Sequence, residues 1–184
     1  MTSVSAPVGR SPRAAQIVAA ARRILESDGS DALTMRRLGD DIGIRAPSLY
    51  KHFPNKRAVE AALIEEAFAE MGAALHAAVA RPGRRGRVTA VLGAYRRTAL
   101  SSPNLYKLAT GPDLPREMLA PDLEAWSGEP FYLATGEPHL AQALWALAHG
   151  MTILEIEGRF WEGSDLDRTW RIAATTFAST AGRV

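Results

Sequence analysis

The chain has 184 residues, of which 47% are hydrophobic and 23% are charged, and it contains no cysteine. This composition is typical of a folded globular protein and excludes disulfides, thiol nucleophiles and cysteine-based zinc sites. It contains no run of about 18 apolar residues, and residues 1–12 are polar, so we predict a cytoplasmic protein with neither a membrane span nor a secretory signal.

The net charge of +2 is distributed unevenly along the chain. Residues 1–57 hold ten Lys and Arg against five Asp and Glu, whereas residues 58–184 hold twelve against fifteen. A basic N-terminal part is typical of a DNA-binding head, although chance produces such differences too. Arg10 and Arg13, in or next to a flexible leader over 1–12, are placed to contact a DNA backbone or minor groove; a leader without contacts is the alternative.

The next segment predicts a support helix followed by the first of two short helices. Apolar residues recur at helical spacing over 14–27, and Asp28-Gly29-Ser30 ends that helix. Thr34 can accept a hydrogen bond from an early amide of the next helix, whose buried face begins at Leu38. Gly43 can adopt the left-handed conformation that stops this helix.

A second short helix follows, in which Pro47 is tolerated because the first turn needs no amide donor there. Leu49 and Phe53, four residues apart, form its inward face. The free face then carries a hydroxyl, a cation and an imidazole, from Ser48, Lys51 and His52. These groups suit a DNA major groove, so the pattern predicts a helix-turn-helix; an ordinary helical hairpin with a solvated polar side is the alternative.

This region resembles the N-terminal DNA-binding domain of the TetR family of transcriptional repressors. The resemblance covers roughly residues 13–60 and is carried by Thr34, Leu38, Gly43, Leu49-Tyr50, His52-Phe53 and Lys56. It implies a repressor that dimerises through its C-terminal helices and releases DNA when a small molecule occupies that half. Arg45 departs from the family pattern, which usually has Ser or Thr as N-cap of the recognition helix. The predicted DNA-binding residues are Thr34, Arg45, Ala46, Pro47, Ser48, Tyr50, Lys51, His52 and Lys56.

The remaining residues predict an all-α fold in two domains, a helix-turn-helix domain over 13–56 and a helical ligand-binding and dimerisation domain over 57–184. Asn55 can cap a long Ala-rich helix that continues to Ala80. Further helices are expected over 88–101, from Pro103 to about Leu108, near 121–127, over 140–160 and over 165–181, with a broken region between 111 and 138.

The helix expected over 140–160 is apolar nearly all round, so each of its sides must be covered. A chain of this length offers limited cover, which predicts a homodimer through the last two helices, about 139–182. Burial within one subunit is the alternative.

Trp145-Ala146-Leu147-Ala148-His149-Gly150 resembles the Trp-His-Gly signature of one class of TetR C-terminal domains. Trp145 and His149 share a helical face and can line an inducer cavity, or they can be ordinary core residues. The candidate ligand-binding residues are Tyr95, Tyr106, Met118, Trp126, Phe131, Trp145 and His149.

Other classes of function find little support in this sequence. The four histidines show no metal-ligand spacing, and no nucleophile elbow, phosphate-binding loop or dinucleotide fingerprint occurs, so we predict no enzyme, metal or cofactor. The preferred hypothesis is a ligand-responsive repressor that binds an inverted-repeat operator as a homodimer, with an unknown inducer and no membrane partner. A sequence-tolerant architectural DNA binder without inducer is the alternative.

Overall fold

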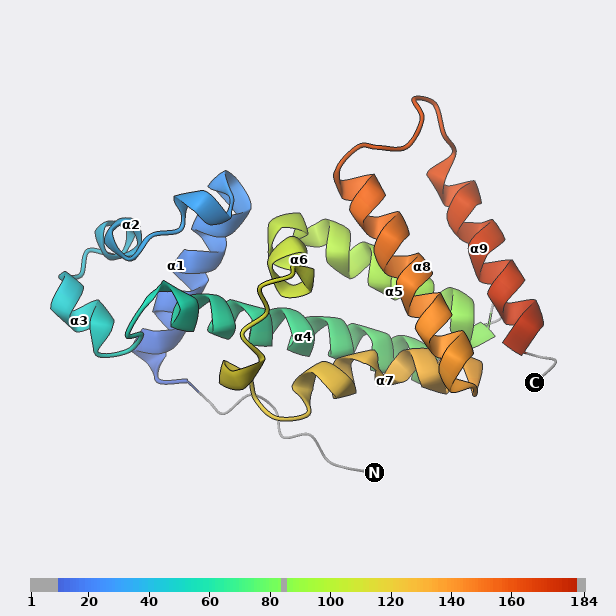
Figure 1. The fold of residues 1–184 in the computed structure, drawn as a ribbon, viewed down its shortest axis with the longest axis horizontal. Helices are drawn as coiled ribbons and strands as arrows, with labels where there is room; N and C mark the ends of the chain where they lie inside the picture. The colour runs from blue at the N-terminus through green and yellow to red at the C-terminus, as the bar shows by residue number, and fades with distance from the viewer. Residues whose placement is uncertain (1–9, 84–85, 182–184) are drawn as a thin grey trace. The chain divides into compact units, whose positions relative to one another are not determined.

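The computed structural model describes residues 10–83 and 86–181, and within these ranges the chain forms helices and loops without a strand (Figure 1). The predicted all-α fold is therefore confirmed. No helix in these two ranges is long and apolar enough to cross a membrane. Of the predicted leader, residues 1–9 lie outside the described residues.

The chain divides into two compact units. The first holds the residues up to Ala69 together with Ser102–Leu123, and the second holds Glu70–Ser101 and the residues from Glu124 onward. Helices of the first unit bury their apolar faces in one core, which includes Ile17, Ile24, Leu38, Leu49, Val59, Leu63 and Leu105. Its elements are α1 (Pro12–Asp28), η1 (Ser30–Ala32), α2 (Met35–Asp41), α3 (Ala46–Tyr50), the start of α4 (Lys56–Ala80), α6 (Pro103–Thr110) and η3 (Arg116–Met118).

Helix α6 belongs to the first unit because its N-terminus is bound to α1. The Glu26 carboxylate accepts hydrogen bonds from the backbone N–H groups of Asn104 (3.3 Å) and Leu105 (2.8 Å), which have no partner inside a helix. The Asn104 amide donates in return to the Leu25 carbonyl (3.0 Å), and Arg22 donates to Ser102 (3.0 Å). The compact units therefore group α6 with the N-terminal helices, whereas the sequence-based division separates them at residue 57.

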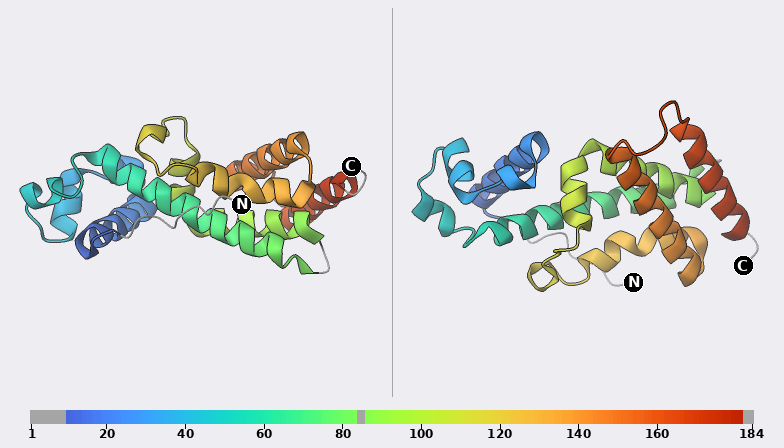
Figure 2. Two further views of the ribbon diagram at one scale, coloured as in Figure 1. Left: turned by 90° about the horizontal axis from the view of Figure 1, so that it is seen from below. Right: turned by 45° about the horizontal axis from the view of Figure 1, so that its top comes forward.

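The second unit is built around α5 (Gly86–Ser101), against which α8 (Pro138–Ile156) and α9 (Leu166–Ala181) pack side by side (Figures 1 and 2). Arg96 of α5 joins the three helices, because its guanidinium binds Glu155 through two nitrogens (2.7 and 3.0 Å) and Asp167 through a third (2.6 Å). The Trp170 indole N–H donates to the same Glu155 carboxylate (2.9 Å). A carboxylate that is mostly buried is thus fully paired.

Helix α7 (Leu123–Thr135) is longer than the short helix expected near 121–127, and Pro130 lies inside it. That expectation was wrong because Pro130 does not end the helix. A proline lacks the N–H that would bond the carbonyl four residues earlier, which here belongs to Trp126. The His76 Nε2 atom lies 3.1 Å from this carbonyl oxygen, so a protonated Nε2 on α4 replaces the missing donor.

The same contact between α4 and α7 is packed without free space. The rings of His76 and Trp126 stack with centroids 4.9 Å apart, and the Trp126 ring lies directly against Gly72. A Cβ atom at residue 72 would lie 2.6 Å from Cε3 and 2.9 Å from Cη2 of the indole, well inside van der Waals contact. Glycine is therefore required at this position for the tryptophan to reach its place.

We expect Gly72→Ala to lower the free energy of unfolding by about 1–3 kcal/mol, because overpacking outweighs the better helix propensity of alanine. The melting temperature measured by circular dichroism should fall by several degrees. Gly128→Ala on α7 is the matched control, since a Cβ there meets no atom within 4 Å, and its stability should stay equal or rise. In the double variant with Trp126→Ala the clash is absent, so the losses of stability from the two single substitutions should not add. An unchanged melting temperature in Gly72→Ala would contradict this packing.

Candidate DNA-binding interface

The turn between α2 and α3 has the geometry that the sequence predicts. Gly43 has a φ of 65°, which is the left-handed region that glycine adopts without strain. The chain reverses tightly, since the Ile44 N–H donates to the Gly39 carbonyl over 3.0 Å. Leu38 of α2 and Leu49 of α3 are both buried in the core, so the two short helices are held as one rigid pair.

The outward face of α3 and of the turn after it carries exposed side chains. Pro47, Ser48, Tyr50, Lys51 and His52 are exposed. No hydrogen bond or ion pair to another residue of the described ranges occupies the side chains of Ser48, Lys51 or His52. Ala46 begins α3, but its side chain lies outside the described part of the structure. This face is available for an external partner.

Arg45 precedes α3 and is exposed as well. Its side chain makes no capping hydrogen bond to the helix, in accord with its departure from the Ser or Thr usual at this place. The guanidinium therefore stands free beside the first turn of α3, where orphan N–H groups and a cation together favour an anion.

Local capping contacts hold the helix pair from both sides. The Thr34 hydroxyl accepts from the Arg37 N–H (3.1 Å), and the Asn55 side chain accepts from the Ala58 N–H (2.9 Å), as predicted. Lys56 donates from Nζ to the Ser30 carbonyl (2.9 Å) and pairs with Glu60 (3.4 Å). This lysine joins the start of α4 to η1, and a phosphate contact by Lys56 stays a prediction.

Arg10 fits neither expectation for the leader, which were a contact with DNA and the absence of any contact. It binds α4 of the same chain. Its guanidinium pairs with Glu65 (2.8 Å) and Glu66 (3.1 Å) of α4 and donates to the Ala62 carbonyl (3.0 Å). Glu65 also accepts from the Ala120 N–H (2.8 Å). The sequence carries no local signal for this contact, because more than fifty residues separate the partners.

Comparison with known proteins identifies the family of this helix pair. Residues 17–63 match the family called bacterial regulatory proteins, tetR family, and residues 88–177 match a tetracyclin repressor-like C-terminal domain. An uncharacterized HTH-type transcriptional regulator of Mycobacterium tuberculosis is 31% identical over 158 residues, which cover 77% of this chain and 69% of that protein. The chain belongs to the TetR family of transcriptional regulators.

Two further likenesses agree with this membership and confirm the family that the motif predicts. The tetracycline repressor protein class A from transposon 1721 of Escherichia coli is 44% identical over 54 residues. That match covers 29% of this TetR-family chain and 25% of the repressor. The solved structure of a protein of unknown function from Rhodococcus has a TM-score of 0.79 and 25% identity, covering 95% of this chain and 98% of that one.

The seven candidate ligand-binding residues of this TetR-family protein are divided between the two compact units. Tyr106 and Met118 belong to the first compact unit, where Tyr106 is buried and Met118 is exposed. The other five belong to the second unit and form separate contacts. These are an edge-to-face contact of Tyr95 with Phe131 (5.6 Å between centroids), the stack of Trp126 on His76, and a contact of Trp145 with His149 (6.2 Å).

The Trp-His pair of α8 lies partly at the surface. The Trp145 side chain is 50% exposed, so it does not line an enclosed cavity within the described part of its unit. His149 is more buried, and this desolvation lowers the pKa of its imidazole below the ordinary value. The neutral ring is favoured at physiological pH. No group of three His, Asp or Glu among the described residues is arranged to hold a metal ion.

Proposed function

We propose that this TetR-family protein is a repressor that binds an inverted-repeat operator as a homodimer and releases it when a small molecule occupies the C-terminal domain. The observation that carries the proposal is the exposed α3 face, where Ser48, Lys51 and His52 make no side-chain hydrogen bond or ion pair within the described residues. This face belongs to a helix pair that is fixed by a buried core. Residues held on rigid elements with free polar ends are what direct reading of a major groove requires.

Within this proposal, Ser48, Tyr50, Lys51 and His52 contact the operator directly. Arg45 and Lys56 add phosphate contacts at the two ends of the motif, while Thr34, Ala46 and Pro47 shape the approach of the backbone. Two copies would place their α3 helices in successive major grooves, about 34–36 Å apart. Such a protein occludes a promoter in the cytoplasm and has no catalytic role.

The proposed dimer uses the outer faces of α8 and α9. No charged residue occurs in α8 between Pro138 and Leu154, and its outer side presents Ala143, Ala146 and Gly150. On α9 the residues from Ile172 to Ala181 are also uncharged. Small uncharged side chains allow a second pair of helices to approach closely, and TetR-family regulators form dimers.

A small molecule would act by binding one state of the dimer more tightly than the other. The shift in operator affinity is then limited by the difference between the two ligand affinities. The match of residues 88–177 to a tetracyclin repressor-like domain supports this part of the proposal.

Fluorescence anisotropy with the DNA that flanks the protein's own gene tests the proposal, with an unrelated duplex as competitor and salt varied. We expect binding that survives the competitor, because direct base contacts add to the phosphate contacts. Equal affinity for both duplexes, falling in parallel with salt, would favour the architectural DNA binder instead. Absence of binding to either duplex would overturn the DNA-binding proposal.

A further inference from the structure

The loop between α8 and α9 presents the most exposed large apolar side chain of the described residues. Trp161 is 86% exposed, compared with 50% for Trp145 and 58% for Ile172. Its indole N–H donates to no atom in the described ranges. A tryptophan offers a large apolar area and one donor, and it is among the residues most enriched where proteins associate.

This loop has a defined shape that holds the indole outward. At its start the Arg159 N–H donates to the Leu154 carbonyl (2.9 Å) around Gly158, whose φ is 63°. At its end the Ser164 N–H donates to the Trp161 carbonyl (3.0 Å) around Gly163, whose φ is 83°. Both turns need the left-handed region that glycine supplies. The exposed position of Trp161 is therefore built into the loop.

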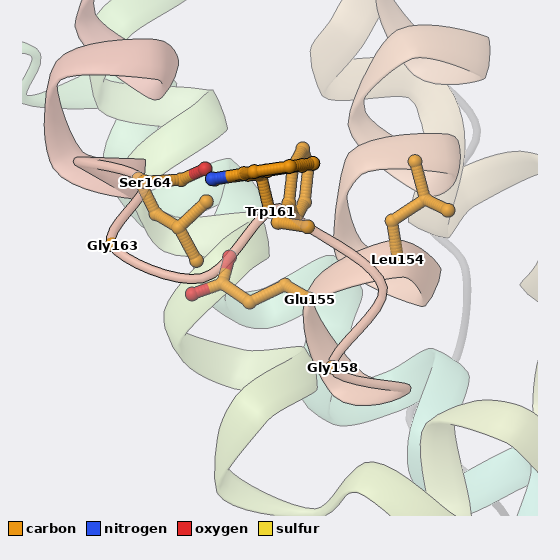
Figure 3. A pocket seen from close by; sticks show the side chains of 8 residues that line it. Leu154, Glu155, Gly158, Trp161, Gly163 and Ser164 are labelled. Atoms are coloured by element: carbon orange, nitrogen blue, oxygen red, sulfur yellow. The ribbon is translucent and has the colours of Figure 1, made fainter.

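A shallow pocket of about 160 Å³ lies beside the indole, lined by the loop and by the adjoining ends of α8 and α9 (Figure 3). Leu154 of α8 and Leu166 of α9 line it together with Phe160 and Trp161. The carboxylate that also lines it, Glu155, is already paired with Arg96 and Trp170. The pocket therefore has no unpaired charge. Leu154 follows Gly150 by four residues, which places both on the same side of α8.

The charges around the loop favour a second copy of the same chain over a partner of one charge sign. Glu162 and Arg168 are both exposed, and neither side chain is paired within the described residues. In a two-fold interface the same patch meets itself, so each residue of one copy faces a different residue of the other. A rim with one free anion and one free cation is complementary to itself in such an arrangement.

We propose that Trp161 is an anchor of the subunit interface, buried with its pocket against a second copy of this chain. The inference rests on the proposed dimer of α8 and α9 and extends it to the loop. Trp161 then contributes to the association of subunits, while the small residues of α8 allow close helix packing. The sequence pattern did not reveal this residue, because a loop tryptophan gives no periodic signal.

Acrylamide quenching of Trp161 fluorescence tests the proposal, measured as the difference between the wild-type protein and Trp161→Phe. Sedimentation equilibrium on the same samples reports the oligomeric state. Gly150→Glu, which places a carboxylate on the outer face of α8, supplies the monomer reference with and without Trp161→Phe. Arg36→Trp in the Trp161→Phe background supplies an exposed control, since the Arg36 side chain of α2 is 93% exposed.

We expect Trp161 to be quenched several-fold less in the wild-type dimer than in the Gly150→Glu monomer, while residue 36 is quenched freely. Trp161→Ala should raise the dimer dissociation constant by about tenfold or more, as for other truncated interface tryptophans. A wild-type dimer in which Trp161 is quenched as freely as in the monomer would overturn this inference and leave the dimer proposal standing. A wild-type protein that sediments as a monomer would overturn both.

Discussion

Gly150→Glu is expected to convert the protein into a folded monomer with about 10²–10⁴-fold lower affinity for its operator. The loss has this size because a dimer engages its second half-site from the same complex, and a monomer does not. A Cβ atom at residue 150 meets no atom within 4 Å inside the subunit, so the substitution finds open space. Glutamate is also a better helix former than glycine, by about 0.5–1 kcal/mol.

On the proposed dimer face the same carboxylate has a different effect. It would be buried against an uncharged surface of the second copy, and by symmetry this happens twice. Desolvating an unpaired charge costs several kcal/mol, which exceeds the gain in helix propensity. Sedimentation equilibrium measures the dimer, circular dichroism the fold, and fluorescence anisotropy the operator affinity.

Gly128→Glu is the matched control for this experiment. It introduces the same residue on α7, at an exposed glycine whose added Cβ also meets no atom within 4 Å. This variant should remain a dimer and bind the operator like the wild-type protein. If Gly150→Glu also remained a dimer with normal operator affinity, the outer face of α8 would not be the subunit interface.

Lys51→Ala is expected to weaken operator binding by about 30-fold or more, since a dimer loses two contacts of roughly 1–3 kcal/mol each. Lys51 follows α3 directly, is exposed, and makes no hydrogen bond or ion pair within the described residues. Its removal should therefore leave the melting temperature unchanged. Anisotropy titrations over a series of salt concentrations measure the effect.

The salt dependence of operator affinity distinguishes a specific contact by Lys51 from the general effect of the chain's basic charge. If the ammonium of Lys51 also neutralises one phosphate in each copy, the slope of log affinity against log salt should fall by about two for the dimer. Lys107→Ala is the matched control, because Lys107 is an exposed lysine of a different helix of the same unit, α6, which lies apart from α3 (Figure 1). Its removal should change neither slope nor affinity. Equal losses in the two variants would remove the argument for α3 as the recognition helix.

Features that depend on neighbouring residues were predictable from the amino-acid sequence. The caps at Thr34 and Asn55, the left-handed Gly43 and the tolerated Pro47 all act within four residues of their own position. These signals, together with apolar residues at helical spacing between them, also predicted the helix pair. The same residues carried the resemblance to the family. The physical reason is that helix starts and stops are decided by local hydrogen bonds and backbone conformation.

Other features were decided only by the tertiary structure, because their partners are far apart in the chain. Pro130 remains inside α7 since His76, 50 residues before Trp126, lies beside the carbonyl that the proline leaves free. Arg10 pairs with α4 rather than standing free for DNA, and Glu26 binds α6 to α1 across 79 residues. The sequence did not show which aromatic residues of the C-terminal half are buried, because burial depends on which helices pack together. The sequence by itself thus determined the DNA-binding motif, whereas packing decided which side chains remain free to act.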